Sequence, residues 1–223
     1  MSAFAAAVAL GYRYVETDVH TTADGVLVAF HDDHLDRVTD RTGRIADLPW
    51  AEVQRARLAG GDGVPLLEDL LGAWPDLRVN IDPKLDNAVA PLVDVLERTA
   101  AHDRVCIGAF SDRRLAAIRR FTGNRVCTSM GPRDVGRLRA ASLGVPVGRF
   151  AAACAQVPVR QGRLTLVDRR FLEAAHGRGL QVHVWTIDDR TEMERLLDLG
   201  VDGLMTDRPD VLKDVLSARV QWC

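Results

Sequence analysis

The sequence predicts an α/β fold, specifically a TIM-type (β/α) barrel in which parallel strands are covered by helices. Short β-branched runs alternate with longer helix-patterned segments along the chain, an arrangement typical of parallel sheets with crossover helices. The chain has 223 residues, of which 47% are hydrophobic and 27% are charged, and this is enough to bury the core of one barrel. We therefore expect one domain over residues 1–223.

Seven segments have the length and composition of parallel strands, one fewer than a closed eight-stranded barrel needs. Several of the intervening helices begin at an Asp or Ser, which can accept hydrogen bonds from free backbone N–H groups. Strands are expected at Tyr14–Val19, Arg78–Asp82, Arg104–Ala109, Arg125–Ser129, Arg163–Val167, Gln181–Thr186 and Asp202–Thr206. Helices are expected at Asn87–Ala101, Asp112–Phe121, Pro132–Ala141, Arg169–Gly177, Asp189–Leu199 and Pro209–Val220.

One long interruption separates the first two expected strands, at the place where a barrel keeps its active-site loops. It runs from Thr21 to Trp74 and contains Asp24-Gly25, a tight-turn signal ahead of the apolar run Val26–Phe30. We predict that residues 21–74 form an active-site insertion. A second stretch, Ala151–Gly162, is rich in Ala and Val without clear periodicity, and we expect it to be irregular.

Composition excludes several classes of protein. A net charge of −2 provides no broad basic surface for nucleic acid, and no run approaches the roughly 18 apolar residues that span a membrane. The four cysteines are widely separated, so neither a disulfide framework nor a zinc site is expected. We expect no stable membrane insertion and take the cytoplasm as the default location, leaving open a signal peptide upstream of Met1.

Two acids share one face of the first expected strand. Because side chains alternate along a strand, Glu16 and Asp18 point the same way, about 7 Å apart. On a half-exposed strand they would be the solvated side. Inside a barrel, two like charges at this spacing are costly unless a cation or proton compensates them, and carboxylate oxygens suit Mg²⁺ or Ca²⁺.

A histidine follows the apolar run Val26–Phe30. His31, with Asp32 next to it, has the side chain best suited to move a proton near neutral pH. A histidine at the end of a strand also serves often as a structural hydrogen-bonding group. The residue alone therefore leaves both interpretations open.

The combination of these features closely resembles the motif series of the glycerophosphodiester phosphodiesterase family of the bacterial type. The resemblance extends over nearly the whole chain. It rests on Glu16-Thr17-Asp18-Val19, Asp24-Gly25, His31-Asp32, Leu35, Arg37, Thr39, Gly43, Pro65–Leu71, Asn80–Lys84, Phe110-Ser111-Asp112, Val184-Trp185-Thr186 and Gly200–Pro209.

The resemblance implies a divalent cation, Mg²⁺ or Ca²⁺, held by Glu16, Asp18 and Asp82. The family usually has a Glu at the third position, so Asp82 is one methylene shorter. His31 matches one of the family's two catalytic histidines. Lys84 matches a lysine that could neutralise a phosphate oxygen, and Trp185 matches an aromatic wall of the substrate pocket. Without the motif, Lys84 would be an exposed loop lysine and Trp185 a core residue.

In the family that the chain resembles, a strand ending in His-Arg-Gly and a loop with a Glu precede the first helix. Met1–Leu10 already resembles that first helix, so the strand and the loop Glu are absent from this sequence. We therefore expect an open barrel with a gap between Tyr14–Val19 and the last strand near Leu204. Either the start codon was assigned too late or the chain is a truncated relative. The implied function is metal-dependent hydrolysis of glycerophosphodiesters to glycerol 3-phosphate and an alcohol. The alternatives are a catalytically impaired barrel that binds a ligand or partner, and a related lyase-type phospholipase.

Overall fold

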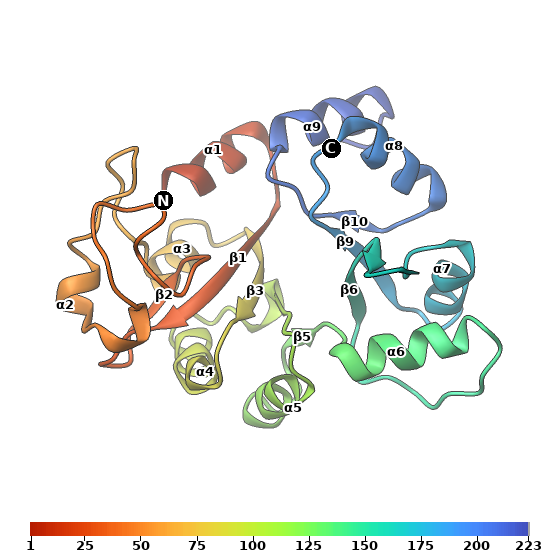
Figure 1. The fold of residues 1–223 in the computed structure, drawn as a ribbon, viewed down its shortest axis with the longest axis horizontal. Helices are drawn as coiled ribbons and strands as arrows, with labels where there is room; N and C mark the ends of the chain where they lie inside the picture. Colours follow the sequence, from red (N-terminus) through yellow and green to blue (C-terminus); the bar gives the residue numbers. More distant parts are fainter. Residues whose placement is uncertain (223) are drawn as a thin grey trace. The chain divides into compact units, whose positions relative to one another are not determined.

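A computed structural model describes residues 1–222 of the chain, and its elements are labelled in Figure 1. The chain divides into two compact units, Met1–Cys127 and the part from Thr128 onward. Strands and helices alternate in both units, which confirms an α/β fold with parallel sheets. The closed or open state of a barrel and the number of its strands stay predictions.

The first unit is built on a sheet with the strand order β2-β1-β3-β4-β5. The parallel pairs β1 with β3 and β3 with β4 form its centre. β1 and β2 are antiparallel and are joined by the expected turn, in which Thr22 N donates to Val26 O at 2.9 Å and Gly25 has a φ of 86°. The bounds are β1 Tyr14–Thr21, β2 Leu27–Ala29, β3 Arg78–Pro83, β4 Val105–Ile107 and β5 Cys127–Thr128.

Helices of the first unit bury one face of β3 and β4. The strand β3 alternates, with Val79 and Ile81 at 1% and 0% exposure, while Asn80 and Asp82 on the other face are half-buried. The buried face packs with apolar residues of α3 and α4, such as Leu70. The face with Asp82 is thereby left for polar side chains. The helices are α1 Ser2–Leu10, α3 Leu67–Ala73, α4 Val89–Arg98 and α5 Asp112–Phe121, with the short η2 Asp86–Ala88 and η3 His102–Arg104.

The predicted insertion contains a small apolar core of its own. Phe30, Leu35 and Ile45 are buried there, and the short helices η1 Ile45–Asp47 and α2 Trp50–Val53 contribute to this cluster. Because these side chains fix the chain that follows β2, the loop after β2 has a defined path. α3 at the end of the predicted range instead joins the main core of the unit.

The second unit contains a parallel sheet with the order β10-β9-β6. Its helices agree with the sequence prediction to within a few residues, and α6 agrees at both ends. The strands are β6 Cys154–Pro158, β9 Gln181–Trp185 and β10 Gly203–Leu204, and the helices are α6 Pro132–Ala141, α7 Arg169–His176, α8 Arg190–Leu199 and α9 Pro209–Ala218.

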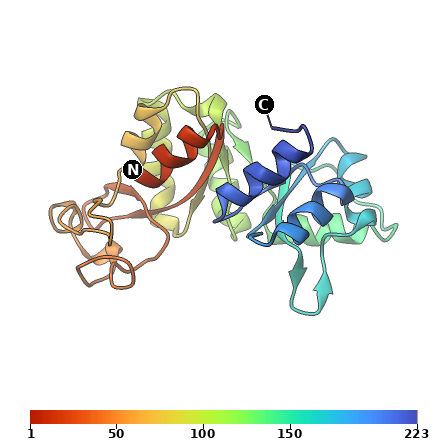
Figure 2. The same cartoon turned by 90° about the horizontal axis from the view of Figure 1, so that it is seen from above.

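Two sequence predictions in this unit are wrong. Arg163–Val167 is not a strand of the parallel sheet, because β8 Leu164–Thr165 pairs only with β7 Arg160–Gln161 in an antiparallel hairpin within residues 1–222. Figure 2 shows this hairpin projecting from its unit. The stretch predicted to be irregular instead supplies β6, which pairs along its length with β9. Its Cys154, Ala155 and Val157 are buried and its Gln156 and Pro158 are half-buried, and a strand with so little exposed surface shows only weak polar alternation in its sequence.

No helix within residues 1–222 is both long enough and apolar enough to span a membrane.

Candidate active site

The parallel pairing of β1 and β3 brings two acids to the same end of the sheet. Asp18 pairs in register with Asp82, and Glu16 pairs with Asn80 two residues earlier. The side chains of Asp18 and Asp82 are 8% and 15% exposed, so both carboxylates are largely shielded from water. The carboxyl ends of parallel strands are the usual position of active sites in α/β proteins.

Lys84 lies between these two carboxylates. Its Nζ is 2.7 Å from Oδ1 of Asp18 and 3.1 Å from Oδ2 of Asp82. The backbone N–H of Lys84 donates to the carbonyl of Val19 at 3.2 Å, which holds the start of the loop against β1. One ammonium therefore compensates two carboxylates that would otherwise repel each other.

The electrostatics of this group follow from its burial. Burial raises the pKa of Asp82, and the charge of Lys84 opposes part of that shift. Burial alone would lower the pKa of Lys84, but the hydrogen bond to Asp18 and the charge of Asp82 outweigh it, so its pKa is raised. Lys84 is therefore a permanent cation at neutral pH.

His31 reaches the same cluster from the end of β2. The backbone N–H of Phe30 donates to the carbonyl of Asp18 at 2.9 Å, which fixes the next residue beside β1. Nε2 of His31 is 3.7 Å from Oδ2 of Asp18, while 77% of the histidine side chain remains exposed. The imidazole of His31 thus lies at the solvent side of the carboxylates.

Asp32 and Arg37 hold His31 in place, although the sequence analysis assigned neither of them a catalytic role. Nδ1 of His31 lies 2.7 Å from Oδ1 of Asp32, and Arg37 donates two hydrogen bonds to the same carboxylate at 2.6 and 2.9 Å. Hydrogen bonds from Arg37 and then from His31 hold the pKa of Asp32 far below its usual range. Because an ionised Asp32 only accepts, Nδ1 of His31 carries the hydrogen and Nε2 is left for chemistry.

His20, on the same strand as Asp18, also supports the histidine. It is 3% exposed, and its Nε2 is 3.2 Å from the carbonyl oxygen of His31. Burial lowers the pKa of His20, which favours a neutral ring that donates to this carbonyl. The in-phase spacing of His20 with Asp18 was the only sequence signal for it.

The group suits a hard divalent cation. Oδ1 of Asp82 is buried and accepts no hydrogen bond within residues 1–222, and the carboxylates of Asp18 and Asp82 supply oxygen ligands of the kind that a hard cation prefers. No set of three or more His, Cys, Asp or Glu side chains in the described part of the chain is gathered to hold an ion by itself. Glu16 is exposed, and its part as a third ligand stays a prediction.

The remaining predicted site residue lies in the second unit. Trp185 is the last residue of β9 and pairs in register with Pro158 at the end of β6. It is half-buried and stands at the carboxyl end of a parallel strand, as Asp18 does in its own sheet. Its part in binding substrate stays a prediction.

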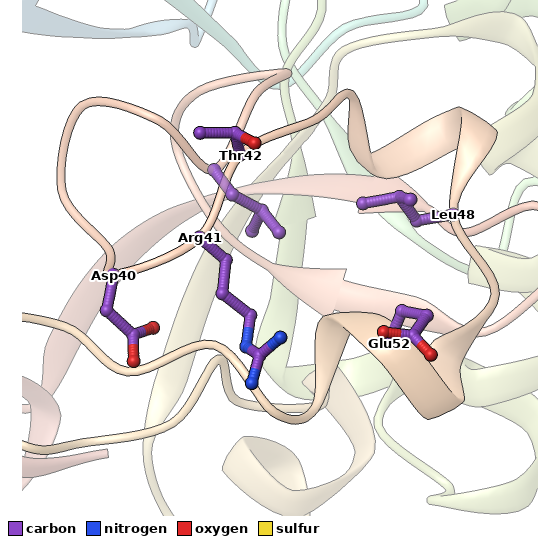
Figure 3. Close-up of a pocket in the computed structure, with 6 residues that line it drawn as sticks. Asp40, Arg41, Thr42, Leu48 and Glu52 are labelled. Atoms are coloured by element: carbon purple, nitrogen blue, oxygen red, sulfur yellow. The ribbon is translucent and has the colours of Figure 1, made fainter.

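A hollow in the insertion lies apart from the predicted residues. Its volume is about 300 Å³, and Figure 3 shows Asp40, Arg41 and Thr42 on one loop and Leu48 and Glu52 on the helical segment η1–α2. None of the predicted site residues is among those that line it within residues 1–222: these are Leu35, Asp40, Arg41, Thr42, Leu48 and Glu52.

The structure is an α/β fold in which carboxylates, an ammonium and an imidazole lie together at the carboxyl ends of parallel strands. The profile of the Glycerophosphoryl diester phosphodiesterase family matches residues 1–211. A protein described as probable glycerophosphodiester phosphodiesterase 2 of Mycobacterium tuberculosis is 44% identical over 230 residues, covering 100% of this chain and 86% of that protein. The chain therefore belongs to the glycerophosphoryl diester phosphodiesterase family, and it is an enzyme of that class.

Solved structures share the fold at lower identity. The glycerophosphoryl diester phosphodiesterase domain of a Mycobacterium tuberculosis protein aligns with a TM-score of 0.81 at 20% identity, covering 97% of this chain and 92% of that one. An Oleispira antarctica phosphodiesterase, solved in complex with the product sn-glycerol-3-phosphate, aligns with a TM-score of 0.78 at 20% identity, covering 94% and 87%.

Proposed function

We propose that this enzyme hydrolyses glycerophosphodiesters to glycerol 3-phosphate and an alcohol, and that it needs Mg²⁺ or Ca²⁺ to do so. One observation carries the proposal: the ammonium of Lys84 compensates Asp18 and Asp82 at the carboxyl ends of β1 and β3, with Nε2 of His31 3.7 Å from Asp18. The relative solved with sn-glycerol-3-phosphate and the family support the choice of substrate.

In this proposal, Asp18 and Asp82 hold the cation, with Glu16 as a third ligand. A divalent cation held by these residues would supply Lewis-acid chemistry toward a phosphate oxygen. Lys84 neutralises a second oxygen of the phosphate, and Trp185 forms a wall of the pocket. Nε2 of His31 would take the proton of the attacking water and pass it to the oxygen of the leaving alcohol, while Asp32 keeps the hydrogen on Nδ1. Water supplies the new oxygen on phosphorus as the bond to the alcohol breaks.

The test is hydrolysis of glycerophosphocholine, followed by enzymatic detection of glycerol 3-phosphate. We expect product with Mg²⁺ or Ca²⁺, no product with EDTA, and recovery when the ion is added in excess. Phosphorus NMR of the same reaction separates hydrolysis from the lyase alternative, which would release a cyclic phosphate. Turnover that is unchanged by EDTA would remove the cation from the proposal. Binding without turnover would favour the alternative of a ligand-binding barrel.

A further inference from the structure

Lysine is rare in this chain. The chain contains 29 Lys and Arg residues, of which only Lys84 and Lys213 are lysines. An arginine can bind a carboxylate through two parallel hydrogen bonds in a fixed geometry, whereas a lysine carries a compact charge on a flexible side chain. The ammonium of Lys84 can therefore move from the carboxylates to another anion.

The position of Lys84 is that of a counter-ion. Its Nζ contacts Asp18 and Asp82 at 2.7 and 3.1 Å, and 34% of its side chain remains exposed. Two shielded carboxylates are costly without a cation nearby. A single positive charge leaves the group one charge short of neutral, and Oδ1 of Asp82 has no partner within residues 1–222. A doubly charged ion in place of the ammonium would neutralise the two carboxylates and give Oδ1 of Asp82 a partner.

We infer that Lys84 is an internal counter-ion that exchanges with the divalent cation. Lys84 compensates Asp18 and Asp82 when no metal is bound, and its ammonium leaves them for a phosphate oxygen when metal takes its place. This inference rests on the proposed function, because it assigns the proposed cation and phosphate to the same carboxylate and ammonium groups. The exchange predicts positive coupling between the two ligands: the divalent cation strengthens the binding of phosphate, and phosphate strengthens the binding of the cation.

The rarity of lysine provides a test on the unaltered protein. Brief acetylation with an N-hydroxysuccinimide ester at fixed pH, followed by peptide mass spectrometry, reports the reactivity of Lys84 and Lys213 separately. We expect CaCl₂ to raise the rate at Lys84 by about fivefold or more relative to EDTA, the lower range of binding couplings. Inorganic phosphate should then lower that rate again, but only in the presence of calcium. Lys213 is the internal control and should not respond.

A second measurement is the calcium affinity by titration calorimetry. Lys84→Met should bind Ca²⁺ about fivefold or more tightly than the unaltered chain, because no ammonium competes for the acids. It should also lose the effect of phosphate on calcium affinity. Lys213→Met is the matched control and should behave as the unaltered chain.

The outcomes separate the exchange from the proposed function. Calcium binding with a constant acetylation rate at Lys84, or with equal or weaker affinity in Lys84→Met, would overturn the exchange and leave the proposed function standing. A chain that binds neither Ca²⁺ nor Mg²⁺ would overturn both. The acetylation experiment decides the question even if Lys84→Met fails to fold.

Discussion

Nδ1 of His31 lies 2.7 Å from Oδ1 of Asp32, and the same carboxylate is held from its other side by Arg37. An ionised carboxylate behind a histidine fixes the tautomer and orientation of the ring and stabilises its protonated form. We therefore expect Asp32 to act through His31, as a positioning residue. The loop that follows β2 carries both His31 and the carboxylate that holds it.

Replacement of Asp32 by Asn should lower kcat by about 10²-fold, the lower end of what acid–base catalysis contributes. The KM should change little, because Asp32 is expected to act on the histidine and not on the substrate. Steady-state rates with glycerophosphocholine, measured across pH, check both statements.

The neighbouring pair of Asp33 and His34 provides a matched control. Oδ1 of Asp33 is 2.9 Å from Nδ1 of His34, and both side chains are exposed. Asp33→Asn removes an equivalent hydrogen bond outside the site, so its kcat should stay within about twofold, as for most surface changes. An equal loss of activity in both variants would show that Asp32 acts only through the loop structure.

Asp82→Asn should weaken the binding of Ca²⁺ by more than about tenfold, because it removes a charge and an oxygen ligand without changing the shape of the side chain. Titration calorimetry on the folded variant measures this loss. Asp86→Asn is the control, because that carboxylate is 48% exposed and pairs with Arg113 and Arg114. If Asp82→Asn kept the affinity of the unaltered chain, Asp82 would not be a ligand.

The strand pattern was sufficient to predict that Asp18 and Asp82 lie at one end of neighbouring strands. Alternate residues share a face of a strand, and the carboxyl ends of parallel strands lie together. The strand pattern does not predict the contact between His31 and Asp32, because consecutive residues of a strand point to opposite faces. The contact forms because the chain no longer has strand geometry after β2. The position of the Lys84 ammonium between the two carboxylates depends on the rotamer of its side chain, which the spacing of residues in the sequence does not determine.

The wrong assignments around β6 have the same kind of cause. Small apolar residues dominate the stretch around Cys154–Pro158 and weaken the alternation that marks a strand, whereas the sequence of Arg163–Val167 alternates in the manner of a half-exposed strand. A strand does form there, but Leu164 of β8 is exposed and Thr165 is half-buried. The strand with which β8 pairs could not be predicted from the alternation, because the hairpin depends on Gly162, whose φ of 59° permits the turn.

Trp185→Ala should raise the KM for glycerophosphocholine by about 10- to 100-fold, the free energy of one large apolar contact. Trp185→Phe keeps most of the aromatic surface, so its KM should rise by less than about fivefold. Initial rates over a range of substrate concentration distinguish the two. A KM unchanged in Trp185→Ala would place Trp185 outside the pocket and leave it a structural residue of β9.

The N-cap of α7 allows a prediction about stability that is independent of the active site. Oδ1 of Asp168 accepts hydrogen bonds from the backbone N–H of Phe171 and from Arg139, both at 2.9 Å, and its Oδ2 is 2.8 Å from Arg139. Asp168→Asn keeps an oxygen for the cap but removes the charge that faces Arg139, which is only 16% exposed. The free energy of unfolding should fall by about 1–2 kcal/mol, less than for a fully buried pair, because Asp168 itself is partly exposed to screening water.

Asp189→Asn at the N-cap of α8 is the control, since Asp189 accepts from the N–H of Glu192 at 2.9 Å and pairs with no arginine in residues 1–222. Its effect should stay within about 0.5 kcal/mol. Burial alone would raise the pKa of Asp168, but the hydrogen bonds from Arg139 and Phe171 outweigh it and lower the pKa. The stabilisation is therefore complete above the unfolded pKa of about 3.9 and is lost as the pH falls through the lower folded value. Urea unfolding should show the difference between the unaltered chain and Asp168→Asn at pH 5–7 shrinking below about pH 4, and a difference that persisted at pH 2 would contradict the ionic contribution.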